Sequence, residues 1–491
     1  MTLPAVFLFA LAAAALTACV SSAKTPIRTP AAELALNPGF LAVPSRAVGG
    51  GLEWTQAERS SLNAALDDVR GTYLDGAGLA VVDEDGTLLY GRHAARGYAP
   101  ASTLKLIVAA AALGTLGPKA TLATSFQSLG GPDAQGRVGD VWLVGNGDPV
   151  FDIGQLRAGI GMLARRGVRQ IGGNLIVDAT AFTGPEQNPK WASDDFENGY
   201  AAGTSALSLN WNVIEFKIAP TVLGRPARVQ VFPLGSPIVV TGTVTTGYGT
   251  DLHIDRVAPG RNEFVVGGTI APGGELSFYR PAAQIAQWVG EIAGSLLRER
   301  SIVLDGTVVP GSQPFVGQTL WEHRSPALTA LLRQMLYESD NHIAEQLLRL
   351  VGAGAGAGSS ASGARAERAY LLSLGVPLEG LRVVDGSGLA EANRVAPLTL
   401  ARLLIAQPTL FDLLPRAGIE GTVRHHQLTS SLGRVRAKSG HIDGVNALAG
   451  YVETRHHGRV AFALLVNAPD ADDAISIQIG IDRALDRISE L

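Results

Sequence analysis

Apolar positions along the chain change their spacing several times, and these changes predict the order of helices and strands. Helical spacing covers residues 55–71, two apolar runs flank a turn between 78 and 90, and residues 106–113 have no polar face at all. These patterns predict a helix, a tight hairpin, and a helix that is buried on every side. The buried helix starts directly after an ionisable residue, Lys105. A charged side chain is costly to bury, so a lysine at this position suggests a functional role.

The middle of the chain predicts β structure. Between residues 120 and 314, short alternating runs are separated by Gly and Pro, and residues 235–278 alternate strongly enough to predict a small β unit of their own. A helix is predicted at 281–300. Helical spacing returns after residue 325, at 327–337, 342–350, 364–374 and 397–405, with a low-complexity connector at 352–363. The end of the chain predicts strands at 445–453 and 460–467 and a helix at 472–489.

This order of elements predicts an α/β protein with several domains, because 491 residues exceed one compact core. Helices and a hairpin at both ends, with β material between them, predict one domain assembled from residues 47–119 and 315–491. The material inserted into it is predicted to form a domain from 120–234 and 279–314. Residues 235–278 are predicted to form a third, nested domain.

The N-terminus predicts export. An apolar run too short for a comfortable membrane span ends in Leu16-Thr17-Ala18-Cys19, which resembles the lipobox of bacterial lipoproteins. We therefore expect a signal peptide at 1–18, a lipid anchor to a membrane at Cys19, and a tether over 19–46 that is rich in Pro, Ala and Thr. A leftover cysteine in an ordinary signal peptide is the alternative. Cys19 is the only cysteine, so no intramolecular disulfide is expected.

Composition limits the classes of partner. The chain is 46 % hydrophobic and 17 % charged, with a net charge of -4, which indicates a globular protein without a nucleic-acid partner. The histidines, including the pairs at 425/426 and 456/457, lack the spacing of metal ligands. No metal or cofactor is expected.

Candidate chemistry begins at Ser102-x-x-Lys105. If Ser102 stands in the first turn of a helix, Lys105 projects from the same face, as a nucleophile and its base would. A serine before a helix is also an ordinary N-cap, so the pair alone leaves both interpretations open. Two further motifs follow in order, Ser339-x-Asn341 and then Lys438-Ser439-Gly440 on a predicted strand.

Together the three motifs resemble the active-site set of the penicillin-recognising serine enzymes. Five further runs narrow the resemblance to the D-alanyl-D-alanine carboxypeptidase/endopeptidase family, the class C low-molecular-mass penicillin-binding proteins; they are residues 145–149, 205–212, 339–345, 385–389 and 440–451. The resemblance extends from about residue 50 to the C-terminus. It implies a penicillin-binding-protein/β-lactamase-like α/β domain, with an antiparallel sheet flanked by helices. The long separation of the first two motifs fits this family, in which two domains are inserted there.

The residues suggest how such a site would work. Ser102 is the expected nucleophile and neutral Lys105 its base, since an apolar site near a second cation such as Lys438 would lower the pKa of the amine. The backbone N–H of Ser102 can serve as one oxyanion donor. Ser339 can relay a proton to the leaving amine, and Asn341 can bind a substrate amide or Lys105.

The third motif suits substrate binding. Lys438 offers charge and Ser439 a hydroxyl to the terminal carboxylate of a peptide, and Gly440 leaves room for the substrate backbone. By resemblance, the backbone N–H of His441 is the second oxyanion donor, while its side chain either crowds the cleft or faces solvent. Asp148 either contacts the substrate side chain or belongs to a routine Asp-Pro turn.

The expected function is a periplasmic serine peptidase that forms an acyl-enzyme with peptidoglycan D-Ala-D-Ala peptides or cross-links and is acylated by β-lactam antibiotics. Two alternatives stay open. A β-lactamase is one, although no Glu-x-x-Leu-Asn element follows Ser339 to supply the deacylating base of class A enzymes. A catalytically retired wall-binding lipoprotein is the other, although it predicts the loss of a nucleophile or base that this sequence retains.

Overall fold

The computed structural model describes residues 54–314, 317–354, 356–467 and 474–490, which fall into two compact units. Of these described residues, those within 54–96, 332–340 and 396–490 belong to the first unit, and those within 97–331 and 341–395 belong to the second. The predicted signal peptide, Cys19 and the tether lie outside the described residues. The predicted division into a catalytic domain, an insertion and a nested β domain stays a prediction.

The first unit is built on a five-stranded antiparallel sheet with the order β18-β19-β20-β1-β2. Strand β1, from the N-terminal part of the chain, pairs with β20 near the C-terminus, with Ala80 opposite Ala463. The sheet therefore contains strands from both ends of the described chain. Its strands are β1 (Gly78–Val82), β2 (Leu88–Arg92), β18 (Val435–Ile442), β19 (Val445–Glu453) and β20 (Arg459–Asn467).

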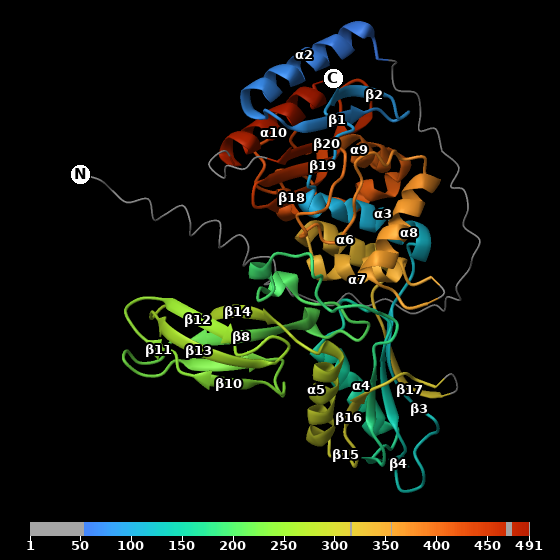
Figure 1. Cartoon of the computed structure of the whole chain (residues 1–491), viewed down its shortest axis with the longest axis vertical. Helices are drawn as coiled ribbons and strands as arrows, with labels where there is room; N and C mark the ends of the chain where they lie inside the picture. Colours follow the sequence, from blue (N-terminus) through green and yellow to red (C-terminus); the bar gives the residue numbers. More distant parts are fainter. Residues whose placement is uncertain (1–53, 315–316, 355, 468–473, 491) are drawn as a thin grey trace. The chain divides into compact units, whose positions relative to one another are not determined.

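Helices cover both faces of this sheet (Figure 1). Helices α2 (Gln56–Tyr73) and α10 (Ala474–Ser489) pack together against one face, in a core that includes Leu66, Leu79 and Leu464. Helix α9 (Pro397–Ala406) contacts β1, β19 and β20, and the Tyr451 hydroxyl of β19 donates to the carbonyl of Leu404 at 2.7 Å. Successive side chains of a strand point to opposite faces of the sheet, so neighbouring apolar residues pack against the helices on the two faces alternately.

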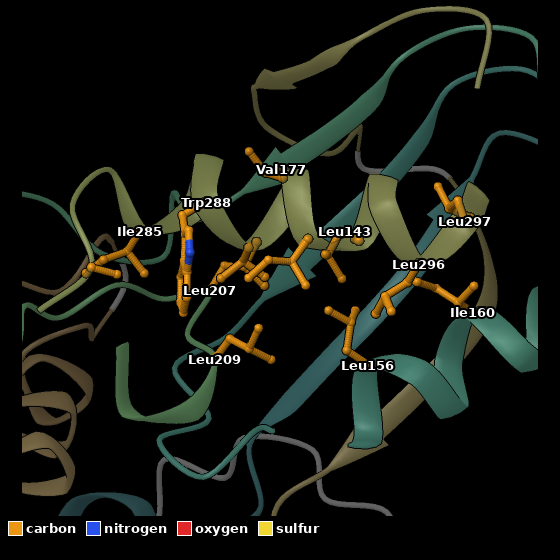
Figure 2. Close-up of a cluster of buried hydrophobic side chains, with 14 of the residues drawn as sticks. Leu143, Leu156, Ile160, Val177, Leu207, Leu209, Ile285, Trp288, Leu296 and Leu297 are labelled. Carbon is orange, nitrogen blue, oxygen red and sulfur yellow. The ribbon is translucent and has the colours of Figure 1, made fainter. Parts of the chain in front are cut away.

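The second unit contains a mixed five-stranded sheet packed against two helices. Its strands are, in order across the sheet, β16 (Val308–Pro310), β7 (Leu175–Asp178), β5 (Val141–Gly145), β3 (Ala123–Ser128) and β17 (Gln318–Arg324). Helices α4 (Ile153–Arg165) and α5 (Ile285–Glu299) bury side chains such as Leu156 and Trp288 in the same core as Leu143 and Val177 (Figure 2). Helix α5 was predicted and α4 was not.

Three smaller sheets complete the β part of the second unit. One holds β15 (Val303–Leu304), β6 (Gln170–Ile171) and β4 (Arg137–Val138), and another holds β14 (Leu276–Pro281), β8 (Val213–Ala219) and β9 (Arg228–Phe232). The third holds β10 (Val239–Gly242), β13 (Glu263–Ile270) and β11 (Thr245–Thr246), with β12 (Asp251–Arg256) paired to β13. All four strands of this third sheet come from the segment predicted to form a β unit of its own.

Helix α3 (Lys105–Leu116) begins three residues after the candidate nucleophile, Ser102. It contacts α7 (Asn341–Val351) and α8 (Ser360–Ser373), and every residue from Lys105 to Leu113 is buried, as predicted. Helix α6 (Leu328–Glu338) precedes α7 in the chain. The predicted connector at 352–363 is wrong at its end, because Ser359 caps α8 by accepting the N–H of Ser362. None of the helices in the described ranges is long and apolar enough to cross a membrane.

Candidate active site

Ser102 lies on a short 3₁₀ turn, Ala101–Leu104, that runs directly into α3. Residues three apart eclipse one another in a 3₁₀ helix, so Lys105 projects beside Ser102. The Lys105 Nζ atom is 2.8 Å from Ser102 Oγ. Ser102 is half-buried, whereas Lys105 is 0 % exposed. The structure thus brings together the pair whose spacing suggested a nucleophile and a base.

The partners of the Lys105 amine include oxygens from distant parts of the chain. Besides Ser102 Oγ, it donates to Asn341 Oδ1 at 2.8 Å and to the backbone carbonyl of Ser387 at 2.8 Å. Asn341 is the first residue of α7, and its Nδ2 atom donates in turn to the carbonyl of Tyr200 at 3.0 Å. The first two motifs therefore meet at one amine. Ser387 belongs to one of the runs that resemble the family, at 385–389, but its sequence context predicts no role for it.

The loop that carries Ser387 is held in a fixed conformation against the Ser102 turn. Its buried Asp385 accepts the backbone N–H groups of Gly388 at 2.8 Å and Ala390 at 2.6 Å. Gly388 has φ +84°, and a Cβ there would stand 1.9 Å from the carbonyl oxygen of Ala101. Only glycine fits both the positive φ and this close approach. Ala101 itself has φ +44°, so the turn before the nucleophile is also strained.

Ser339, in the first unit, stands at the end of α6 in a left-handed conformation with φ +58°. The N–H of Asp340 bonds to the carbonyl of Met335, which closes the end of the helix in a Schellman arrangement. Glycine usually occupies this position, because a side chain there is strained. A serine held in a costly conformation is typical of a functional residue, since strain of this kind collects at active sites.

The third motif lies on β18, the edge strand of the first unit's sheet. Lys438 is 0 % exposed, and its Nζ donates to the backbone carbonyl of Ser439 at 2.7 Å. The N–H of Ala437 and the carbonyl of Val435 both bond away from β19, to a segment at 415–417. Alternate residues of a strand direct their backbone groups to the same side. The N–H of His441 therefore also points away from β19, as a backbone donor to a ligand would.

The side chains of the third motif differ in exposure, and one of them contacts a residue that the sequence did not indicate. The His441 ring is exposed and pairs with Asn446 Oδ1 at 3.0 Å. Gly440 is buried within the strand. The Ser439 hydroxyl is 2.7 Å from the Thr422 hydroxyl, and either oxygen can donate. The sequence did not indicate a role for Thr422, because a single threonine in a loop belongs to no recognisable motif.

Asp148 lies in the second unit with its side chain entirely buried. One carboxylate oxygen accepts the N–H of Val150 at 3.0 Å, and the other lies 3.5 Å from His323 Nε2. Burial raises the pKa of Asp148 to about 7, and burial lowers the pKa of His323. The contact of Asp148 with a substrate side chain stays a prediction.

The predicted site residues therefore divide between the two units. Ser102, Lys105 and Asn341 belong to the second unit, where they form one hydrogen-bonded group. The first unit contains the other predicted site residues in the described ranges except Asp148, namely Ser339, Lys438, Ser439, Gly440 and His441. Cys19, the predicted lipidation site, lies outside the described residues. The catalytic and binding roles of all these residues stay predictions.

Comparison with known proteins gives a consistent assignment. The model of the D-Ala-D-Ala carboxypeptidase 3 (S13) family matches residues 59–488. A D-alanyl-D-alanine carboxypeptidase of Actinomadura sp. strain R39 is 32 % identical over 90 % of this chain and 86 % of its own length. The D-alanyl-D-alanine carboxypeptidase DacB of Haemophilus influenzae is 29 % identical over 76 % of this chain and 81 % of its own length.

Solved structures agree with the sequence matches. The crystal structure of penicillin binding protein 4 from Haemophilus influenzae has a TM-score of 0.77 and 25 % identity, and it covers 86 % of this chain and 99 % of its own. The same protein complexed with a β-lactam has a TM-score of 0.69 and covers 85 % of this chain and 98 % of its own. The predicted family, fold class and enzyme class are confirmed. The chain belongs to the D-Ala-D-Ala carboxypeptidase 3 (S13) family and is a serine hydrolase.

Proposed function

We propose that this enzyme hydrolyses D-Ala-D-Ala peptide bonds of peptidoglycan by an acyl-serine mechanism, with Ser102 as nucleophile and Lys105 as general base. The observation that carries the proposal is the buried Lys105 amine, which lies 2.8 Å from the Ser102 hydroxyl and has two further oxygen partners. The family membership supports the choice of substrate.

The hydrogen-bond partners of Lys105 support its role as base, because they favour one direction for its lone pair. An ammonium donates three hydrogen bonds, whereas a neutral amine has two N–H groups and one lone pair. The oxygens of Asn341 and Ser387 are carbonyl oxygens, which only accept. Of these three oxygens, the Ser102 hydroxyl oxygen is the one whose group can also donate. In the neutral amine the two hydrogens therefore go to the carbonyl oxygens, and the lone pair is directed at the hydroxyl proton of Ser102.

The reaction then has two halves. In acylation, the Ser102 proton passes to Lys105 as Oγ attacks the carbonyl carbon of the penultimate D-Ala, and the C–N bond breaks when the leaving amine takes up a proton. In deacylation, water attacks the ester, and Ser102 regains its proton. A β-lactam follows the first half, but its leaving amine stays tethered to the acyl group, so the enzyme is held as an adduct.

The residues of the first unit are assigned to the substrate by the family pattern. Lys438 and Ser439 are proposed to bind the terminal carboxylate, which a cation and a hydroxyl suit. An extended peptide can pair with an edge strand such as β18, and its carbonyl oxygen would accept from the outward N–H of His441. Ser339 is proposed to pass the proton to the leaving amine. Asp148 is proposed to contact the side chain of the substrate.

Release of D-alanine tests the proposal. The wild type, Ser102→Ala and Lys105→Met are incubated with a stem pentapeptide and, separately, with cross-linked peptide dimers, and the products are identified by mass spectrometry. We expect D-alanine or separated monomers from the wild type and neither from the two variants. The substrate consumed faster identifies the enzyme as chiefly a carboxypeptidase or chiefly an endopeptidase. Undiminished release by Ser102→Ala would overturn the assignment.

The substrate and the N-terminal sequence both support a proposal for the cellular location. We propose that the enzyme acts in the periplasm, attached to a membrane through a lipid on Cys19, because peptidoglycan lies outside the cytoplasm and residues 1–19 match a lipoprotein signal. Fractionation of cells that express wild type or Cys19→Ser tests this. We expect the wild type in the membrane fraction and the variant outside it, whereas equal partition of the two proteins would refute the anchor.

A further inference from the structure

Glu345 is a buried carboxylate that the mechanism above does not use. It lies on α7 four residues after Asn341, so both side chains project from the same face of the helix, one turn apart. Glu345 is 2 % exposed, and one of its oxygens, Oε1, accepts the N–H groups of Gly386 at 2.9 Å and Ser387 at 2.8 Å. The charged groups that act on it are Asp385, Glu367 and Arg349.

These bonds connect Glu345 to the catalytic amine through one residue. The N–H of Ser387 bonds to Glu345, and its carbonyl oxygen accepts from Lys105 Nζ at 2.8 Å. Helix α7 therefore fixes both carbonyl acceptors of Lys105, with Asn341 in direct contact and Glu345 acting through the loop. Loss of either acceptor would remove one of the bonds that orient the amine, and its lone pair would be directed less well at Ser102.

We infer that Glu345 is a positioning residue for acylation: it anchors the 386–387 backbone so that the Ser387 carbonyl holds Lys105 in the orientation that accepts the Ser102 proton. The inference rests on the proposed function, in which Lys105 is the base for Ser102. It assigns Glu345 a geometric role and gives it no contact with substrate.

Two other roles for the Glu345 carboxylate, metal binding and a purely electrostatic effect, fit the structure less well than positioning does. A metal site would need several converging ligands, yet no group of three or more His, Cys, Asp or Glu side chains in the described ranges could hold an ion. A role through negative charge is weakened by burial and the nearby charge of Asp385, which raise the pKa of Glu345. A protonated carboxyl still accepts both N–H groups through its carbonyl oxygen, so the geometric role does not need the charge.

Two substitutions separate geometry from charge. Glu345→Gln keeps the length of the side chain and an oxygen that can accept both N–H groups, but it removes the charge. Glu345→Asp keeps the charge and is one methylene shorter, so its carboxylate cannot hold both groups in place. Glu367→Gln is the matched control, because Glu367 is buried nearby and neither of its oxygens accepts a hydrogen bond from the described residues.

The measurement is the time course of benzylpenicillin labelling, followed by intact-mass spectrometry for the wild type, the three variants and Ser102→Ala. We expect Glu345→Asp to slow acylation by roughly 10²-fold, the penalty of a misplaced catalytic group, and to reach full labelling eventually. Glu345→Gln and Glu367→Gln should stay within a few-fold of the wild-type rate. A variant that is partly unfolded gives a different result: its final labelled fraction is lower, while the folded molecules are labelled at the wild-type rate.

The outcomes that overturn the inference are distinct. A wild-type rate for Glu345→Asp, or a reduced final fraction at the wild-type rate, would refute the positioning role. Slow labelling of Glu345→Gln with fast labelling of Glu345→Asp would show that charge matters and geometry does not. In all these cases Ser102→Ala still lacks the adduct, so the proposed function survives. An adduct on Ser102→Ala would instead overturn the proposed function, and this inference with it.

Discussion

Glu367 offers a direct test of the electrostatics of the second unit. The residue lies on α8 and is 0 % exposed, and its two carboxylate oxygens accept no hydrogen bond from any residue that the structure describes. Burial, together with the charges of Glu345 and Asp385, raises the pKa of Glu367 well above its ordinary value. Methionine has a similar length and carries no strongly polar atom. We therefore expect Glu367→Met to increase the free energy of unfolding.

The magnitude follows from the cost of an unsatisfied buried group. Leaving such a group without a partner costs about 1–3 kcal/mol, so the substitution should stabilise the protein by roughly that amount. The raised pKa also predicts how the stability difference between Glu367→Met and the wild type changes with pH. A carboxyl whose pKa is raised by folding contributes its stability at low pH and loses it as the pH rises from the unfolded-state pKa towards the folded-state pKa. The advantage of Glu367→Met should therefore grow between pH 4.5 and pH 7.5.

Urea unfolding followed by circular dichroism at these two pH values measures the effect. Glu379→Met is the control, because Glu379 is exposed and its replacement should change the free energy of unfolding by no more than about 0.5 kcal/mol. The reasoning is refuted if Glu367→Met unfolds at the same urea concentration as the wild type or a lower one. A gain that is equal at both pH values would contradict the raised pKa.

Three further substitutions probe the site and the core. Gly388→Ala places a Cβ 1.9 Å from the Ala101 carbonyl, so we expect penicillin acylation to slow by about 10²-fold; a wild-type rate in a stopped-flow assay would contradict this. Asn341→Leu removes an acceptor from buried Lys105, which should lower kcat/KM for D-alanine release about 10–100-fold; an unchanged value would argue against the role of Asn341. Trp288→Ala should cost about 3–5 kcal/mol in urea unfolding, because Trp288 is 1 % exposed in the core of Figure 2; a loss below 1 kcal/mol would refute that burial.

Local pattern was sufficient for most of the elements. The hairpin at 78–90 and the strands at 445–453 and 460–467 appear with bounds within two residues of those predicted, because alternation and turn residues are local signals. Helix α4 was missed because three glycines interrupt its apolar stripe. Its start signal was present, since Asp152 and Gln155 form a capping box. The start of α8 was missed because its first turn is made of Ser, Ala and Gly.

The candidate site was predictable as a set of motifs but not as a set of contacts. The spacing of Ser102 and Lys105 within one helical turn is a local feature of the sequence, and in the structure the two side chains are in contact. The bond from Lys105 to the Ser387 carbonyl joins residues far apart in the chain and uses a backbone atom, which no side-chain motif reveals. Glu345 did have a signal, because a glutamate four residues after Asn341 falls on the same helix face. The partner of that glutamate depends on how the 385–388 loop folds back.

The central claim, that Ser102 is the acylated nucleophile, is tested most directly by locating a penicillin adduct. The protein is treated with benzylpenicillin and digested, and the modified peptide is sequenced by tandem mass spectrometry. We predict one adduct of the mass of intact penicillin on Ser102, long-lived, and absent from Ser102→Ala. An adduct on another residue would contradict the claim, and so would rapid release of hydrolysed penicillin without a detectable adduct, which is the behaviour of a β-lactamase.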